Sequence, residues 1–363
     1  MKTSLQLAVH SSRIWKNLSY KFAFCFFIVL NGPSLTVKAQ DIHFTQFFTT
    51  PLILNPAQTG YYDGNYRIGF NFKAQWPWAA PNSTYNYHTE SPYIDFSFGE
   101  RKIKTGWMGI GLHFLNDEAG DGRLTSRRFG LSYAYHQSFD KKHRYVLSAG
   151  ASLNYVVRSV DYDKFYFNNQ WIEDNGFDPS VNSNEPFTHQ SFSFFDVSAG
   201  LHFGARVSEK VKLGGGFSLL HINRPKNSFY GGNVRLGFRY QANVSADYQI
   251  SNSFSLSLQA YYGYEKKSSE IMFGSLAGYS FQSRKNVVGD HMLYLGAYYR
   301  LKDALAPVLG YQYKSTRILL NYDITLSKLM PTGRANGGPE LSIVHIGKWN
   351  KEFNGKKVYC PRM

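Results

Sequence analysis

One stretch of the chain concentrates side chains suited to binding another molecule. It spans residues 216–229 and reads GFSLLHINRPKNSF. The imidazole, guanidinium, ammonium and amide groups in it can form charge-assisted hydrogen bonds with a carboxylate or a backbone carbonyl. The sequence therefore predicts a partner-binding region here, and an equally open alternative is a loop pinned to the rim of the protein beneath it. The candidate residues are His221, Asn223, Arg224, Lys226 and Asn227.

No recognised catalytic motif accompanies this stretch. The chain has no G-x-S-x-G, H-E-x-x-H or Walker A pattern, and these patterns mark common hydrolases and nucleotide-binding enzymes. We therefore expect a protein that is not an enzyme and uses no cofactor, with a hydrolase built from Ser and His on neighbouring strands as the alternative. Residues 116–122, NDEAGDG, lack the spacing of an EF-hand calcium loop, so we expect solvated carboxylates there and no metal.

The element that positions the candidate stretch follows it directly. From residue 234 to residue 250, apolar or aromatic residues alternate strictly with polar residues or Gly. Successive strand side chains point to opposite faces, so this alternation indicates a β-strand with one apolar side. At about 3.3 Å per residue the run would reach about 55 Å, far beyond a usual soluble strand. Such a length suits a tilted strand that crosses a membrane and continues into solvent.

Composition favours the same architecture for the whole chain. Aromatic residues make up 17% of the 363 residues, yet the mean hydropathy is −0.36, and no apolar run of membrane-helix length follows the leader. We predict an all-β fold, a transmembrane antiparallel β-barrel of about fourteen strands, with a soluble β-sandwich as the alternative. The predicted strands are residues 66–75, 93–98, 105–114, 128–139, 144–157, 194–205, 211–222, 234–250, 254–264, 271–283, 291–300, 304–313, 317–326 and 340–346.

Several charged residues fall in phase with the polar face of these strands. In a barrel they would line the lumen, where a charge needs water or a counter-charge. They would either pair with inward carboxylates or hold an acidic cargo tail or a plug. The predicted lumen-facing residues are Arg67, Lys73, Arg128, Arg235, Arg239, Asp247 and Asp323.

The first 39 residues have the features of a signal peptide. Basic residues precede an apolar core at residues 22–30, and Val37-Lys38-Ala39 resembles a cleavage site. The mature chain is then expected to begin near Gln40, with a retained signal anchor as the alternative. Residues 40–363 are predicted to form one barrel domain, with residues 40–60 packed on or in the barrel because their apolar groups would otherwise be exposed.

Cleavage would change both the charge and the cysteine content. The formal net charge of +15 falls to +10 with the loss of five basic residues and no acidic ones. The basic residues are dispersed, so we expect no nucleic acid partner. Only Cys360 remains, which excludes an intrachain disulfide and leaves a free thiol or a bond to another chain.

Three stretches of the chain resemble one protein family. The first is FTQFFTTPLILNPAQTG, the second is GFSLLHINRPKNSF, and the third is NYDITLSKLMPTGRANGGPELSIVHIG followed by Cys360-Pro361. Together and in this order they resemble the PorP/SprF family of type IX secretion system membrane proteins. The matching residues are Gln46, Pro51, Asn55, Pro56, Ala57 and Gly60, then His221, Pro225, Lys226, Ser228 and Phe229, and finally Asn321, Asp323, Gly337, Gly338, Glu340 and Cys360.

The resemblance implies a location and a set of partners. Members of the family are outer-membrane β-barrels of gliding or secreting Bacteroidetes, and they work with the type IX translocon to export and retain large adhesins. The implied partners are the C-terminal domain of a secreted surface protein, the translocon with its periplasmic components, and outer-membrane lipid. A passive, porin-like channel is the alternative function, because a wide polar-walled barrel can hold water.

Overall fold

The computed structural model describes residues 44–75, 87–99, 105–120, 122–140, 142–178, 180–185, 189–281, 290–327 and 336–349. The predicted signal peptide and Cys360 lie outside these residues. Within them, no helix is long and apolar enough to cross a membrane.

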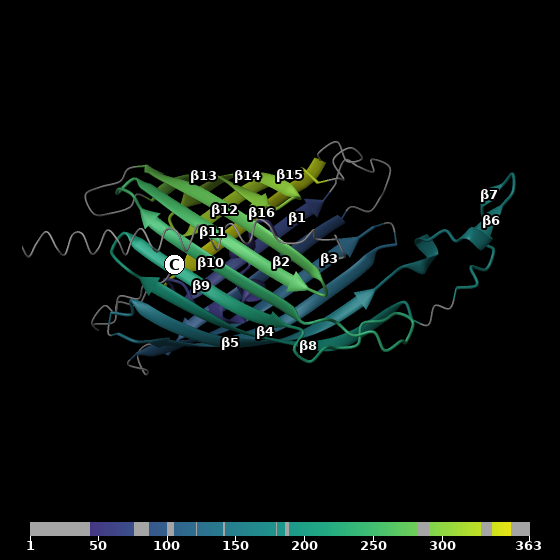
Figure 1. Cartoon of the computed structure of the whole chain (residues 1–363), viewed down its shortest axis with the longest axis horizontal. Helices are drawn as coiled ribbons and strands as arrows, with labels where there is room; N and C mark the ends of the chain where they lie inside the picture. Colours follow the sequence, from purple (N-terminus) through teal and green to yellow (C-terminus); the bar gives the residue numbers. More distant parts are fainter. Residues whose placement is uncertain are drawn as a thin grey trace, which may run out of the picture. The chain divides into compact units, whose positions relative to one another are not determined.

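In the described part of the chain, fourteen antiparallel strands close into one barrel, and β16 pairs with β1 to complete the ring (Figure 1). The predicted fold class and strand number are confirmed. The barrel strands are β1 (Tyr66–Gln75), β2 (Tyr87–Phe98), β3 (Gly106–Ala119), β4 (Leu124–Ser138), β5 (Tyr145–Ser159), β8 (Ser191–Arg206), β9 (Val211–Leu220), β10 (Arg239–Gln249), β11 (Phe254–Glu265), β12 (Ser268–Phe281), β13 (His291–Arg300), β14 (Ala304–Tyr313), β15 (Thr316–Thr325) and β16 (Asn336–Gly347).

Alternation along each strand produces an apolar outer face and a polar lumen. On β4, Phe129, Leu131 and Tyr133 are exposed on the outside, whereas Ser132 and His136 are fully buried on the inside. This distribution is the reverse of a soluble protein and matches a barrel surrounded by lipid. Because the ring is closed, no strand edge of the barrel is left unpaired.

The connections differ in length on the two ends of the barrel. The end that follows β5 and β9 carries residues 160–190 and 221–238, and the first of these contains η3 (Tyr162–Lys164), η4 (Asn168–Gln170) and a small sheet of β6 (Trp171–Ile172) and β7 (Gly176–Phe177). The opposite end joins β8 to β9 and β14 to β15 by short turns. Outer-membrane barrels carry long loops on the cell surface, so we assign the first end to the outside.

The strand in the structure is shorter than the alternating pattern at residues 234–250 that predicted it. The structure begins β10 at Arg239, while β9 ends at Leu220 and β11 ends at Glu265, so the preceding residues have no strand beside them. Among the described residues, an isolated bridge between Lys226 and Arg235 continues the pairing, flanked by backbone hydrogen bonds from Asn227 to Val234 and from Leu236 to Pro225. Residues 234–238 continue the alternation, but they cannot extend β10 because neither β9 nor β11 reaches far enough to pair with them. The prediction of one long strand is therefore wrong.

The predicted start of the second strand is wrong by six residues. The prediction placed residues 76–92 in a loop and began the strand at residue 93, just after Pro92, which has no N–H group to donate to a ladder. In the structure β2 begins at Tyr87 and pairs with β1 through Pro92 without interruption. The register with β3 instead skips Ser91 and Pro92. The ladder between β1 and β2 thus tolerates the missing N–H group of Pro92, whereas the ladder between β2 and β3 loses two residue pairs.

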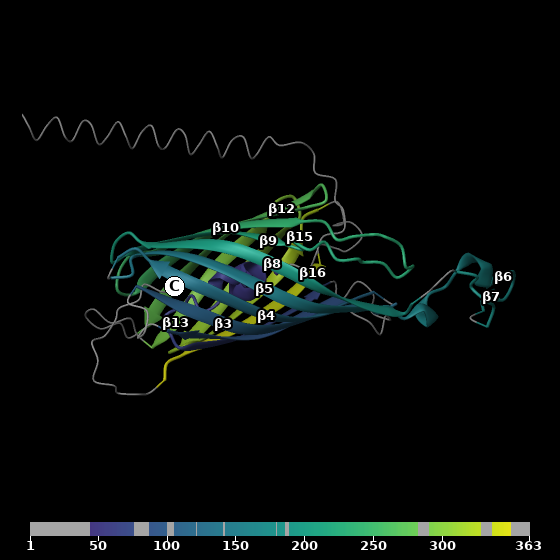
Figure 2. The ribbon, with the colours of Figure 1, turned by 90° about the horizontal axis from the view of Figure 1, so that it is seen from below.

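The segment before β1 occupies the lumen. Residues 44–62, called the plug here, contain η1 (Phe47–Thr49), α2 (Pro51–Leu54) and η2 (Pro56–Gln58). Nearly all of their side chains are buried, and they contact strands from opposite sides of the barrel (Figure 2). The prediction that residues 40–60 pack on or in the barrel is confirmed for residues 44–60, which pack inside it; residues 40–43 lie outside the described residues.

Candidate functional site

The first residues of the plug bind two strands from the far end of the chain. The backbone N–H groups of Thr45 and Gln46 donate to the two carboxylate oxygens of Glu340, at 2.9 and 2.8 Å. The Thr45 hydroxyl donates to Asp323 at 2.9 Å, and the Gln46 amide donates to Asn321. β15 and β16 thus hold the plug through hydrogen bonds to two carboxyl groups and one side-chain amide.

Two cations balance these carboxylates. The Lys73 ammonium lies 3.4 Å from Asp323 and 3.9 Å from Glu340, and an Arg300 guanidinium nitrogen lies 3.2 Å from Asp323. All four side chains are at most a tenth exposed. Burial makes each charge dependent on its partners, because removing one would leave another without compensation. The cluster therefore ties β1, β13, β15 and β16 to the plug.

A second charged contact fixes the other end of the plug. Asp95 is fully buried and accepts two hydrogen bonds from Arg67, at 2.9 and 2.7 Å. It also accepts the backbone N–H of Gly60 at 2.7 Å, while Arg67 donates to the carbonyl of Gln58 at 3.1 Å. The plug thus runs from Thr45, near the outer ends of β13 and β15, towards the start of β1.

Glycines in the wall make room for the centre of the plug. A side chain at Gly150 on β5 would place its Cβ 2.5 Å from the carbonyl oxygen of Pro56. A Cβ at Gly200 on β8 would collide with the side chain of Asn55. Asn55 itself is fully buried and donates to the carbonyl of Leu201 at 2.9 Å. Lumen-facing glycines therefore shape a hollow that fits the plug.

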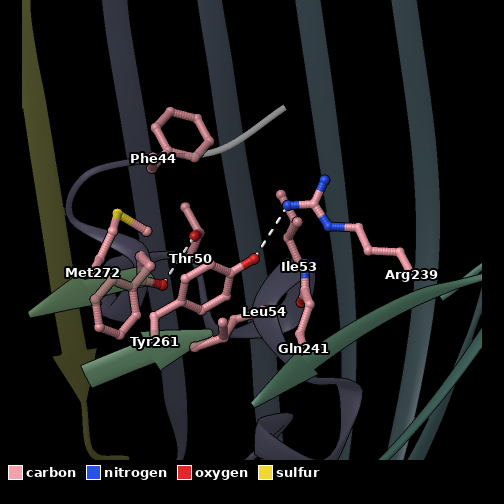
Figure 3. A pocket seen from close by; sticks show the side chains of 9 residues that line it. Phe44, Thr50, Ile53, Leu54, Arg239, Gln241, Tyr261 and Met272 are labelled. Atoms are coloured by element: carbon pink, nitrogen blue, oxygen red, sulfur yellow. Dashed lines mark hydrogen bonds between the residues drawn. The ribbon is translucent and has the colours of Figure 1, made fainter. Parts of the chain in front are cut away.

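The remaining side of the plug is apolar. Phe47 packs on Tyr261 and Tyr298, with ring centroids 5.4 and 6.1 Å apart. Between plug and wall lies a cavity of about 30 Å³, lined in part by Leu54 and Met272 (Figure 3). A cavity of this size has room for a water molecule and is far smaller than a pocket for an organic ligand.

The predicted binding residues mostly hold their own loop in place. His221 is buried, and its Nδ1 lies 2.9 Å from an oxygen of the fully buried Asp196. Asn223 donates to the carbonyl of Phe195 at 2.7 Å and accepts the N–H of Val197 at 3.1 Å. These contacts pin the loop at residues 221–238 to β8.

The other three candidates lie further along this loop. Asn227 accepts a hydrogen bond from Arg158 at 3.0 Å, which adds a third link to the barrel. Arg224 and Lys226 are exposed, and the Arg224 guanidinium lies over the ring of Phe238, 5.4 Å from its centroid. The five candidates thus divide into pinning residues and two solvent-accessible cations.

The residues predicted to face the lumen are placed there with one exception. Arg67, Lys73, Arg128, Arg239 and Asp323 are buried inside, and Asp247 is half-buried beside Ser257. Arg235 is exposed in the loop before β10, where it donates to the carbonyl of Arg224. The prediction for Arg235 is wrong because it depended on the strand starting at residue 234.

Sequence reasoning did not identify the plug site as a site. Gln46, Asn55, Asn321 and Glu340 were singled out only as residues that carry the family resemblance, whereas Asp323 was also predicted as a charge facing the lumen. The structure brings these matching residues from the two ends of the chain together in the lumen. The family-matching residues in the first and last stretches of the chain were thus the sequence signal that could have indicated this site. No sequence signal indicated Arg300, because a single Arg at a strand end does not show which residue it pairs with.

No group of three or more His, Cys, Asp or Glu side chains that could hold a metal ion is present among the described residues. The site as described is a set of docking contacts between plug and wall.

Comparison with known proteins places the chain in a family. No curated protein matches it. It is similar to the solved toluene transporter TbuX of Ralstonia pickettii, with 11% identity over 82% of this chain and 93% of that chain and a TM-score of 0.47. A Pseudomonas aeruginosa FadL homologue shares 10% identity over 80% of this chain and 92% of that chain, with a TM-score of 0.46. The model of the family "Type IX secretion system membrane protein PorP/SprF" matches residues 36–343. The chain therefore belongs to the PorP/SprF family of type IX secretion system membrane proteins.

Proposed function

We propose that the protein is a non-enzymatic outer-membrane component of the type IX secretion system that anchors a secreted surface protein. It is exported with a cleaved signal peptide, residues 1–39. It then binds the C-terminal secretion domain of an adhesin and supports its export and its retention on the cell surface. Family membership supports the link to the secretion machinery, and the translocon and its periplasmic components are further partners in this proposal.

The plug is the observation that favours an anchor over a passive channel. Its contacts reach β1, β2, β15 and β16 through buried charges, and β5, β8 and β9 through close packing. Channels for solutes need a continuous water-filled path, and this lumen is occupied at the level of the plug. A rigid, filled barrel instead provides a fixed base for the outer loops.

Exposed aromatic side chains on the outer loops support a protein-binding role. Tyr166 and Trp171 in the loop after β5 are 67% and 57% exposed, and Tyr230 in the loop after β9 is 55% exposed. Tyr and Trp dominate the energetic centres of protein interfaces because they bury large areas with little loss of side-chain freedom. We assign contact with the secreted domain to these loops.

The test measures the amount of secreted protein that stays on cells. A deletion strain complemented with wild-type protein is compared with strains carrying Trp171→Ala or Phe139→Ala. Phe139 is a matched control because it is an aromatic residue of similar exposure, 65% against 57%, but lies in a turn at the opposite end. We expect Trp171→Ala to lower surface retention and Phe139→Ala to leave it unchanged, with equal amounts of folded barrel. Normal surface display in the deletion strain would refute the proposed function.

A further inference from the structure

Three cations form a continuous cluster on the outer rim, between the loop before β10 and the turn after β11. The Lys266 ammonium donates to the carbonyl of Arg235 at 2.9 Å. Arg235 in turn donates to the carbonyl of Arg224 at 3.2 Å, and Arg224 lies over Phe238. All three cationic side chains are exposed. Two of the cations are thus positioned by the backbone of the next one, and Arg224 is positioned by the ring of Phe238.

This cluster lacks a counter-charge in the described protein. Residues 221–238 contain no Asp or Glu, and no described carboxylate forms an ion pair with Arg224, Arg235 or Lys266. The adjacent Glu265 is half-buried and is paired in register with Arg239, on the lumen side of the wall. Like charges in one cluster repel one another, and a bound anion reduces that repulsion.

The turn that carries Lys266 has an unusual backbone. Lys266 and Lys267 join β11 to β12 with φ values of +41° and +72°. Two positive φ angles in a two-residue hairpin favour Asn and Gly, because a side chain strains this conformation. Two lysines therefore occupy positions where local structure favours other residues.

An aromatic belt lies directly beneath the cluster on the lipid side. Tyr240 packs between three rings, with centroid distances of 6.3 Å to Phe217, 6.5 Å to Phe238 and 6.3 Å to Tyr264. All four side chains are exposed; Phe217, Tyr240 and Tyr264 lie on β9, β10 and β11, which neighbour one another in the barrel (Figure 1), and Phe238 directly precedes β10. Aromatic belts mark the level of the lipid headgroups.

The depth of the cations follows from this belt. Lys266 comes two residues after Tyr264, in the turn that follows the end of β11 at Glu265, so it lies up to roughly 7 Å further out at about 3.3 Å per residue. That depth corresponds to the charged groups of the outer-leaflet lipids. Guanidinium and ammonium groups bind phosphate oxygens through charge-assisted hydrogen bonds.

We propose that Arg224, Arg235 and Lys266 form a binding site for the phosphate groups of a phosphorylated outer-leaflet lipid, whose acyl chains lie along the belt around Tyr240. Arg224 and Arg235 lie in the same loop as Tyr230, but none of the three cations is among the aromatic residues assigned to the secreted protein. An acidic protein segment is the less favoured occupant, because it would have to lie against an apolar, membrane-facing belt.

The experiment measures binding of diphosphorylated lipid A to the purified full chain in detergent micelles by native mass spectrometry. The test variant combines Arg224→Gln, Arg235→Gln and Lys266→Gln. The control variant combines Lys142→Gln, Lys210→Gln and Lys314→Gln, which removes three cations from turns at the opposite end. We expect the test variant to bind about tenfold more weakly or worse, and the control variant to bind like wild type.

Further comparisons keep the outcome decisive. Dephosphorylated lipid A should bind wild type and test variant equally weakly, and heat-modifiable migration should show that all variants fold. If the triple variant did not fold, the single variant Lys266→Gln would be compared with Lys314→Gln, with loss of binding expected only in the former. Equal lipid binding by wild type and test variant overturns the proposal. So does a soluble polyglutamate peptide that displaces the lipid from wild type, because the site would then take an acidic protein.

Discussion

Neutralising Asp95 should loosen the plug from the wall and lower the stability of the barrel. In Asp95→Asn the side chain keeps its size but no longer carries the charge that faces Arg67 and the Gly60 N–H. Arg67 is only 8% exposed, so its guanidinium would remain buried without a counter-ion. Breaking a buried pair in this way costs about 3–5 kcal/mol, or more than about a hundredfold in the ratio of folded to unfolded protein.

Unfolding in urea, followed by intrinsic fluorescence in lipid vesicles, measures this loss. Trp107 is a local reporter because it is fully buried and its indole N–H donates to the Gly60 carbonyl at 3.0 Å. We expect a lower urea midpoint and a red-shifted Trp107 emission in native buffer. The control is Asp140→Asn, which removes a carboxylate from an exposed pair with Arg144 and should leave the midpoint unchanged. Equal midpoints for the two variants would show that the buried pair does not secure the plug.

The other predictions concern the hollow and the loop. Gly150→Val should displace the plug, because its Cβ would overlap the Pro56 carbonyl. Gly215→Ala should be tolerated, because a Cβ there meets only ordinary contacts. Protease cleavage within the plug would distinguish the two variants, and a protected plug in Gly150→Val would contradict the packing argument. Asn223→Ala removes two hydrogen bonds to β8 and should favour opening of the loop at residues 221–238 by about 1–3 kcal/mol, which limited proteolysis of that loop would detect. His221→Ala leaves Asp196 buried without its imidazole partner, so we expect a lower unfolding midpoint, and an unchanged midpoint would mean that this pair contributes little.

The sequence predicted the barrel well because the residues of a membrane strand alternate between facing lipid and facing the lumen, so their polarity alternates too. The predicted strands at residues 66–75, 291–300 and 304–313 coincide with β1, β13 and β14. The error at residue 234 has a physical cause, since alternation reports which face is apolar but not whether a neighbouring strand is present. The error at Pro92 arose because Pro weakens one ladder without ending the strand.

The site was less predictable because it depends on contacts between distant parts of the chain. Alternation placed Lys73 and Asp323 in the lumen, yet it could not show that they meet Glu340 and the backbone of Thr45. The plug has no strand periodicity, so its contacts follow only from packing in three dimensions. The loop candidates were chosen by residue type, which does not distinguish a pinning residue such as Asn223 from an exposed one.

Conductance in planar lipid bilayers tests most directly whether the barrel is a plugged anchor. Purified wild-type protein should show no steady conductance, because residues 44–62 fill the lumen and are held at both ends. Gly150→Val should conduct once the plug is displaced, while Gly215→Ala should remain closed like wild type. A steady open conductance of the wild-type protein without partners would contradict the account and favour a passive channel.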